Sequence, residues 1–227
     1  MIVKREVHLQ FMLALLALNL TSCCVFKNKP EYQPSGSLAC AEFGGGDAED
    51  ADYLMGFQIG NFLVYDLETC ENLFSSEFSL EAGILYSRKG NERSFEETGG
   101  DGPEDFSYSF TEQTRTSYLD IPIRAKVPVY KGLSVSGGPQ ASILLGAKST
   151  QEANGNKSTS KGTEGFNGLD IGLSVGINYE LNNGLSFGFG YDHGLSNVYK
   201  SDYSSQNIKN RFYKATVGIN LNKLQNR

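Results

Sequence analysis

Apolar residues recur at every second position through much of the chain, and this alternation is the feature that most constrains its fold. Between 168 and 181, the even positions hold Gly, Asp, Ser, Asn and Glu, whereas the odd positions hold Leu169, Ile171, Leu173, Val175, Ile177, Tyr179 and Leu181. A period of two places alternate side chains on opposite faces of a β-strand. The segment is therefore predicted to be a strand with one apolar face and one small, polar face.

The same alternation recurs along the chain and ends in a strand close to the C-terminus. Several of these segments run to about ten residues, the length that a tilted strand needs to cross a bilayer. Eight strands are predicted, and they begin near residues 37, 55, 73, 115, 132, 168, 184 and 208.

The connections between the predicted strands alternate between short and long. The short ones fall at 66–72, 130–132 and 182–183, and the longer, polar ones fall at 44–54, 90–114, 149–167 and 199–207. An even number of strands with short turns at one end and long loops at the other is typical of an outer-membrane barrel. The sequence therefore predicts an all-β fold, an eight-stranded antiparallel up-and-down transmembrane β-barrel of the cell outer membrane.

The strand predicted at 115–130 indicates which face contacts lipid. Its odd positions from 119 to 129 are all apolar, whereas its even positions include Asp120, Arg124 and Lys126. Soluble lipocalins also have eight up-and-down strands, but they need bulky apolar side chains inside and polar ones outside. Here the polar face is rich in Gly, Ser and Asn, which suit the narrow lumen that eight strands leave. The apolar face is predicted to face lipid, and a lipocalin-like carrier or a secreted β-sandwich is the alternative.

Charged residues of the polar face are predicted to form a cluster in the lumen. Asp120, Arg124 and Lys126 share one strand, and Glu77 and Glu81 lie on the strand before it. Charges in a poorly hydrated space must be paired, and the fork of donors on an Arg can serve two carboxylates. We expect Arg124 to pair with these carboxylates.

Charge and hydropathy exclude two classes of protein. The net charge of -6, without a basic stripe, argues against a nucleic-acid partner. No run of eighteen apolar residues follows the N-terminus, which excludes a bundle of membrane helices. Asp and Glu gather at 47–52 and 96–105 instead. These segments are interpreted as solvated acidic loops, because the Gly and terminal Glu of a calcium loop are missing.

The N-terminus has the features of an export signal. Lys4 and Arg5 precede a short apolar run at 11–18, and small residues follow. The junction at 20–23 resembles a bacterial lipobox, so Cys23 could be lipidated, and ordinary signal cleavage near 22–24 is the alternative. The predicted organisation is a signal peptide at 1–23, a periplasmic segment at 24–35, the barrel at 36–222 and a tail at 223–227.

Cysteine and histidine usage indicates no metal site. The chain has four Cys and two His, without a paired Cys motif. In an exported protein Cys40 and Cys70 could form a disulfide. Two separate thiols are the alternative.

Asp192 and His193 are the one pair that suggests acid–base chemistry, with Ser196 as a third member by composition. Neighbouring residues of a strand point to opposite faces, which is a poor arrangement for a hydrogen-bonded triad. We therefore expect an interfacial His. No catalytic residue and no cofactor is predicted, and the protein is not expected to be an enzyme.

Three segments, 77–90, 118–148 and 168–198, resemble the PorT-type outer-membrane β-barrel family, small porin-like barrels of Bacteroidetes-group bacteria. Its landmarks are the Tyr-Leu-x-Ile-Pro strand at 118–122, Gly138-Pro139 and the Tyr-x-x-Gly-Leu-x-Asn segment at 191–197. The resemblance spans about 36–221 and implies an eight-stranded barrel in the outer membrane without established catalytic residues. Some members act in protein secretion. Two departures are the lipobox at Cys23 and a C-terminus without a final aromatic residue.

The expected role is structural, or that of a binding platform that uses the long acidic loops outside the cell. The expected surroundings are outer-membrane lipid and envelope proteins, with the chain as a monomer. A component of a secretion apparatus is the first alternative. A lipid-modifying barrel enzyme is another, because some eight-stranded barrels have that activity.

Overall fold

The structure is a computed structural model that describes residues 25–26, 29–45, 52–68, 78–99, 106–201 and 207–225. These residues form ten strands and one short helix: β1 (Val25–Phe26), β2 (Glu31–Gly44), β3 (Asp52–Glu68), β4 (Phe78–Gly99), β5 (Phe106–Tyr130), β6 (Leu133–Ala153), β7 (Asn156–Lys161), β8 (Leu169–Glu180), β9 (Leu185–Gly194), β10 (Lys209–Ile219) and α2 (Leu221–Gln225).

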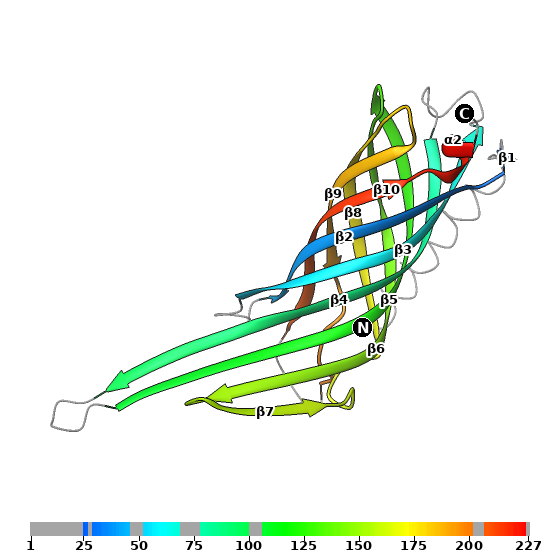
Figure 1. Ribbon diagram of the computed structural model, residues 1–227. Helices are drawn as coiled ribbons and strands as arrows, with labels where there is room; N and C mark the ends of the chain where they lie inside the picture. Colours follow the sequence, from blue (N-terminus) through cyan, green and yellow to red (C-terminus); the bar gives the residue numbers. More distant parts are fainter. Residues whose placement is uncertain are drawn as a thin grey trace.

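Eight of the strands close into a ring (Figure 1). Its order is β2-β10-β9-β8-β6-β5-β4-β3, and the pairing of β3 with β2 completes the circle. Every neighbouring pair is antiparallel, so the chain runs up and down around the barrel. The predicted eight-stranded up-and-down barrel is confirmed. Its first strand begins at Glu31, earlier than the predicted boundary at residue 36.

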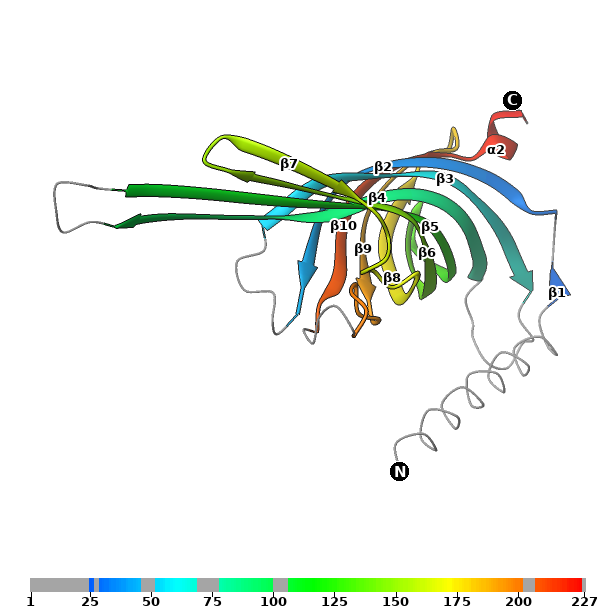
Figure 2. The ribbon, with the colours of Figure 1, turned by 90° about the horizontal axis from the view of Figure 1, so that it is seen from below.

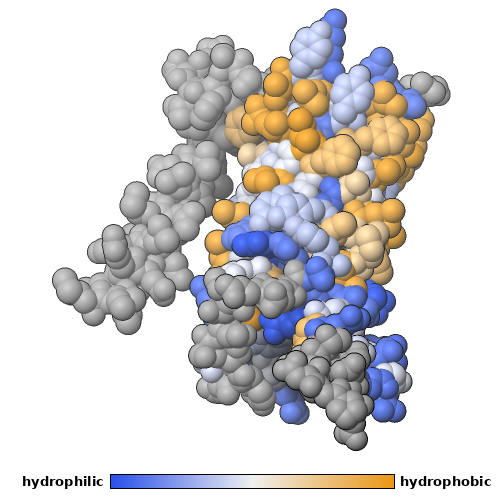
Figure 3. All heavy atoms as spheres, turned by 90° about the vertical axis from the view of Figure 1, so that its left-hand side faces the viewer, coloured by the Kyte–Doolittle hydropathy of each residue, from blue (hydrophilic) through white to orange (hydrophobic). Residues whose placement is uncertain are grey.

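The two faces of the strands differ as the alternation predicts. On the outside Ile84 is 65% exposed and Ile123 is 49% exposed, whereas Ser174 and Thr116 on the inside are fully buried. Figure 3 shows apolar residues over the upper part of one side of the molecule and hydrophilic residues below them. Among the described residues, no helix is long and apolar enough to cross a membrane.

Two tight turns join strands at one end of the barrel. Lys131 and Gly132 connect β5 to β6, and the turn before β9 ends at Gly184. Gly132 has φ 76° and Gly184 has φ 85°, both in the left-handed region that glycine adopts without a steric cost. The C-terminal end of the barrel sequence lies beside the second of these turns. There Asn220 N donates a hydrogen bond to Gly184 O at 2.8 Å, directly before α2 begins.

The prediction of long loops at 90–114 and 149–167 is wrong for most of these residues. β4 and β5 stay paired up to Gly99 and Phe106, and β6 turns at Asn154 into β7. β4 and β5 contain 22 and 25 residues, about twice what a bilayer requires. The excess, with β6 and β7, forms a four-stranded sheet that projects from the barrel (Figures 1 and 2). We call it the sheet extension; it comprises β4 from Asn91, β5 to Arg115, β6 from Ala147, and β7.

The reason for this error is chemical. A strand outside the membrane needs no apolar face, so the extension lacks the alternation that marks the other strands. Its residues are rich in Thr and Ser, and Thr favours extended backbone. The rings of Phe95 and Phe110 stack across β4 and β5 with centroids 5.1 Å apart.

Placing a charge on the lipid-facing surface should hinder folding into a membrane. We predict that Ile123→Arg lowers the free energy of unfolding in lipid by about 2–4 kcal/mol, the cost of a cation near the bilayer midplane. Urea unfolding in lipid vesicles measures this difference. Ile123→Val is the matched control, because it keeps the apolar surface, and equal stability of the Arg and Val variants would contradict the assignment of the faces.

Candidate functional site

The lumen contains a continuous chain of charged and amide side chains drawn from five strands. Lys214 Nζ on β10 lies 2.7 Å from Asp192 Oδ2 on β9, and Lys89 Nζ on β4 lies 3.0 Å from Asp120 Oδ1 on β5. Gln58 on β3 connects the two pairs: its Oε1 accepts from Lys214 at 3.1 Å and its Nε2 donates to Asp120 at 2.8 Å. We call Asp192, Lys214, Gln58, Asp120 and Lys89 the central chain.

Every member of the central chain is nearly inaccessible to solvent. The side chains of Lys89 and Asp120 are 3% and 0% exposed, and those of Lys214 and Asp192 are 4% and 5% exposed. An unpaired charge in such a place would be very unfavourable. Here each ammonium contacts a carboxylate, and Gln58 supplies both a donor and an acceptor. The central chain is therefore a fully paired polar core.

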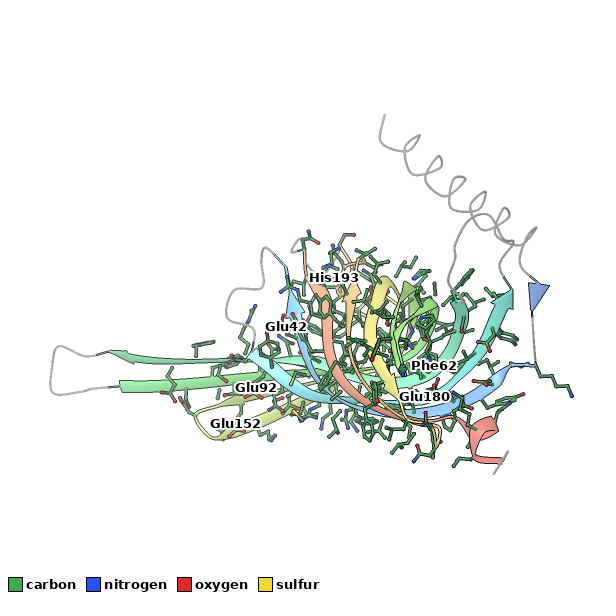
Figure 4. All side chains as sticks on the ribbon, turned by 90° about the horizontal axis from the view of Figure 1, so that it is seen from above. Glu42, Phe62, Glu92, Glu152, Glu180 and His193 are labelled. Atoms are coloured by element: carbon green, nitrogen blue, oxygen red, sulfur yellow. The ribbon has the colours of Figure 1, made fainter. Side chains whose placement is uncertain are left out.

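A second group of ion pairs lies on β4 and β5, towards the end of the barrel that carries the tight turns. Arg124 Nη2 and Nε lie 2.8 Å and 3.0 Å from Glu81 Oε2. The ammonium of Lys126 approaches the other oxygen of Glu81 at 3.5 Å. The guanidinium carbon of Arg124 also lies 4.3 Å from the centre of the Phe62 ring, a cation–π contact (Figure 4 labels Phe62). Glu81 is thus shared between two cations.

A third group fills the lumen on the other side of the central chain. Asn210 Nδ2 donates to Asp170 at 2.8 Å and to the hydroxyl of Tyr118 at 3.4 Å. The ring of Tyr118 lies beneath the ammonium of Lys89, 5.0 Å from it. Tyr118 thus connects the Asp170 group to the central chain.

Segments outside the strands cover the end of the barrel that lies next to this third group. Phe43, Val198 and Ile208 form a buried apolar cluster, and Phe166 and Tyr199 pack against it. Phe166 and Tyr199 also form an isolated β-bridge. The apolar cluster therefore lies at the end of the barrel where β2, β9 and β10 meet the longer connections.

Two small cavities lie inside the barrel among the described residues. A cavity of about 40 Å³ lies beside Arg124 and Lys214, and another of about 10 Å³ lies beside Lys89 and Asp170. Such volumes hold a few water molecules at most. The lumen is therefore filled by side chains and does not form an open channel among the described residues.

The structure distributes the predicted charge cluster differently from the prediction. Glu81, Arg124 and Lys126 lie together, but Asp120 pairs with Lys89 rather than with Arg124. Glu77 lies outside the described residues. Of the carboxylates predicted beside Arg124, Glu81 contacts it, whereas Asp120 pairs with Lys89 instead. Asp120 and Arg124 are four positions apart on one strand, whereas Lys89 of the adjacent strand reaches Asp120 directly.

Sequence reasoning also missed members of the central chain, namely Lys89, Gln58 and Lys214, and considered Asp192 only as a catalytic residue. The signal was present, because all four lie on the polar face of alternating segments. Periodicity gives the face of a residue but not its partner, and Lys214 and Gln58 are 156 positions apart.

Asp192, His193 and Ser196 do not assemble into a triad. Asp192 points into the lumen towards Lys214, whereas His193 Nδ1 lies 2.8 Å from the hydroxyl of Tyr191. Ser196 Oγ accepts a hydrogen bond from Ile171 N. The described residues also contain no group of three or more His, Cys, Asp or Glu side chains that could hold a metal ion.

The predicted disulfide involves one residue that the structure describes. Cys40 is a free, exposed thiol on β2 and lies opposite Met55 of β3. Cys70 lies outside the described residues, so the disulfide between Cys40 and Cys70 stays a prediction. Cys23 also lies outside the described residues, so lipidation stays a prediction.

An ion pair ties α2 to the end of the barrel with the tight turns. Lys223 Nζ lies 2.6 Å from Glu180 Oε1, and Lys126 of the lumen reaches the other oxygen of Glu180 at 4.0 Å. Burial opposes the charge on Lys223, but its hydrogen bond and attraction to Glu180 outweigh this and raise the pKa of Lys223. Figure 4 shows Glu180 at the end of the barrel opposite His193.

Comparison with known proteins identifies similar barrels. Residues 42–200 match the model of a family described as "Outer membrane protein beta-barrel domain". No curated protein matches the chain. Among solved structures, Neisserial surface protein A shares 12% identity over 83% of this chain and 96% of its own, with a TM-score of 0.42. Ail, the attachment invasion locus protein of Yersinia pestis, shares 13% over 85% and 99%, with a TM-score of 0.39. The outer membrane enzyme PagL shares 13% over 81% and 99%, with a TM-score of 0.29.

Removing a lumen cation should destabilise the barrel most where the carboxylate that it pairs with contacts no second cation. We predict that Lys214→Met destabilises the barrel by about 3–5 kcal/mol, because Asp192 then stays buried without its partner. Arg124→Met should cost less, because Lys126 remains beside Glu81. Urea unfolding in lipid measures both.

The double variant Lys214→Met with Asp192→Leu is the control for charge burial. It should recover part of the loss, because no unpaired carboxylate remains. If Lys214→Met were no more destabilising than Arg124→Met, the contrast between single and shared carboxylates would be wrong.

Proposed function

Because the chain belongs to the outer-membrane protein β-barrel domain family, we propose that it is a closed barrel that carries a binding platform at the cell surface. Its location in the outer membrane follows from the family and the fold. The platform is the sheet extension. This proposal replaces the acidic loops expected from the sequence with a regular β-structure, whose tip at 100–105 lies outside the described residues.

The observation that carries the first half of the proposal is the filled lumen. The central chain joins β9, β10, β3, β5 and β4 across the interior. Four lumen cations, Lys89, Arg124, Lys126 and Lys214, each lie within 4 Å of a carboxylate. A path for solutes would have to break these contacts in a space that holds only a few waters.

The second half of the proposal rests on the length of β4 to β7. Strands that continue beyond the membrane hold their side chains at fixed spacing, which suits recognition better than a flexible loop. Both free edges of the extension carry exposed polar side chains: Ser94 and Glu96 are exposed on β4, and all six residues of β7 are exposed. Lys157 and Lys161 on β7 also discourage edge-to-edge aggregation.

No enzymatic step forms part of the proposal, since Asp192 is engaged by Lys214 and His193 lies on the other face of its strand. The proposal also includes membership of the narrower group of PorT-type barrels, supported by the landmark segments 118–122 and 191–197. A role in secretion would need a periplasmic partner. Export by the signal at 1–23, and lipidation at Cys23, are likewise proposed from the sequence alone.

Electrical recording tests whether the lumen is closed. We predict that the wild-type protein produces no stepwise current in planar lipid bilayers. As a control, replacing Lys89, Asp120, Asp192 and Lys214 together by Ser removes the charges of the central chain, and a folded variant should conduct. Regular, single-size current steps from the wild-type protein would overturn the closed-barrel proposal.

Labelling in intact cells tests the orientation of the extension. We predict that Thr159→Cys, on the exposed strand β7, reacts with a membrane-impermeant maleimide in intact cells. Asn182→Cys, in the turn before β9, should react only after the outer membrane is permeabilised. The unmodified protein measures the background from its own four Cys. The opposite labelling pattern would place the extension in the periplasm.

A further inference from the structure

Three cations form one cross-strand row on the sheet extension, and no carboxylate of the described residues forms an ion pair with them. Arg115 on β5 lies opposite Lys148 on β6, and Lys148 lies opposite Lys161 on β7. Residues directly opposite in antiparallel strands share a face, with Cβ atoms about 4.5–5.5 Å apart. Arg88 on β4 lies opposite Ser117, one diagonal step from Arg115. We call Arg88, Arg115, Lys148 and Lys161 the cation row.

The cation row lies on the outer face, where Arg88 and Arg115 are half-buried. Arg115 has the same parity on β5 as Leu119 and Ile123, which face outward, and Lys148 and Lys161 are exposed. Like charges directly opposite one another destabilise a sheet unless an anion lies between them. Within the described residues, none of the four forms an ion pair with a carboxylate.

Two carboxylates on the same face of the extension are already engaged by other side chains. Glu92 accepts a hydrogen bond from Gln113 Nε2 at 2.6 Å, and Glu152 lies 3.9 Å from Lys157. Figure 4 shows Glu92 and Glu152 on the extension, outside the ring of strands. The chain as a whole has a net charge of -6, so the cation row is a local positive patch on an acidic protein.

The position of the row relates it to the membrane surface. On the outer face of β5 and β6 the last apolar pair is Leu119 with Ile143. Ser117 with Gly146 follows, and Arg115 with Lys148 comes next. Four residues of a strand rise about 13 Å, or about 10 Å along the membrane normal for a strand tilted by about 40°. The row therefore lies at the level of lipid headgroups, directly beyond the hydrocarbon-facing surface.

There is also space for a ligand between the apolar pair and the row. A side chain added at Gly146 would meet no other atom within 4 Å. On the neighbouring strand Tyr86 places its hydroxyl 3.0 Å from Ser117 Oγ. Aromatic and hydroxyl groups at this depth are typical of the interface between a barrel and lipid headgroups.

From this geometry we propose that the cation row binds the phosphate groups of phosphorylated lipid headgroups. Arg88 and Arg115 present planar forks of donors that match phosphate oxygens, and Lys148 and Lys161 add point charges. A phosphate beside Gly146 would relieve the repulsion between the paired cations while the acyl chains of the lipid cover Leu119 and Ile143. This apolar contact favours a lipid over free phosphate.

The test uses a single fluorescent reporter, because the chain contains no Trp. Ile143→Trp places an indole below the row, and the full chain is reconstituted in phosphatidylcholine vesicles. Brominated phosphatidic acid, which carries a phosphate monoester, is compared with brominated phosphatidylcholine as quencher. We expect phosphatidic acid to associate about tenfold more strongly, since each cation near a membrane surface favours anionic lipid.

The variant Arg115→Gln with Lys148→Gln and Lys161→Gln should abolish this preference. The matched control is Lys131→Gln with Lys157→Gln, which removes cations outside the row and should leave the preference unchanged. Heat-dependent mobility on a gel verifies that each variant is a folded barrel. Lack of preference in the parent protein, or a preference that survives the triple substitution, would overturn the proposal.

Inorganic phosphate provides the remaining arm. If the site recognises a lipid headgroup, free phosphate at the concentration of the lipid should not restore the fluorescence of the Trp reporter. Full displacement of the brominated lipid by free phosphate would mean that the site binds free phosphate, and it would overturn the lipid assignment. The orientation proposed above decides only which leaflet of the outer membrane supplies the lipid. Both leaflets of the vesicle contain the brominated lipid, so the opposite orientation would leave the quenching result unchanged.

Discussion

Hydrocarbon offers no hydrogen-bond partner, so each backbone N–H and C=O within the membrane must be paired inside the protein. A sheet meets this requirement only when it has no open edge. Here the pairing of β2 with β3 closes the ring that begins with β2 and β10. Closure fixes the register between strands that are distant in the sequence, and the side chains of the lumen depend on that register for their partners.

The lumen shows how closure affects the choice of side chains. Eight strands leave an interior only wide enough for side chains to fill, and outward-facing positions must be apolar. Polar residues are thus confined to a small space without bulk water, where charges are stable only in pairs. Gln58 is central because its amide satisfies both Lys214 and Asp120. The same contacts that stabilise the interior also fill it among the described residues.

Beyond the membrane the constraint on the strands changes. Water can pair with free edges, so β4 and β7 can end a sheet there, and alternation of apolar residues is no longer required. The extension therefore carries Thr, Ser and charged residues while it keeps the hydrogen bonding of the barrel strands. The cation row lies at the boundary between the membrane-spanning part of the strands and the part in water, above Leu119 and Ile143.

The sequence by itself determined the number of barrel strands, their direction and which face is apolar. This was possible because successive residues of a barrel strand face lipid and lumen in turn, so apolar and polar residues alternate. It could not predict the extension, whose polar strands look like loops, or the partner of each lumen charge. Asp120 pairs with Lys89 and Lys214 with Asp192, whereas the alternation alone predicted Asp120 only as one of the carboxylates beside Arg124. Only the tertiary structure decided these pairs, because the register of the closed ring sets which side chains from different strands lie at the same height in the lumen.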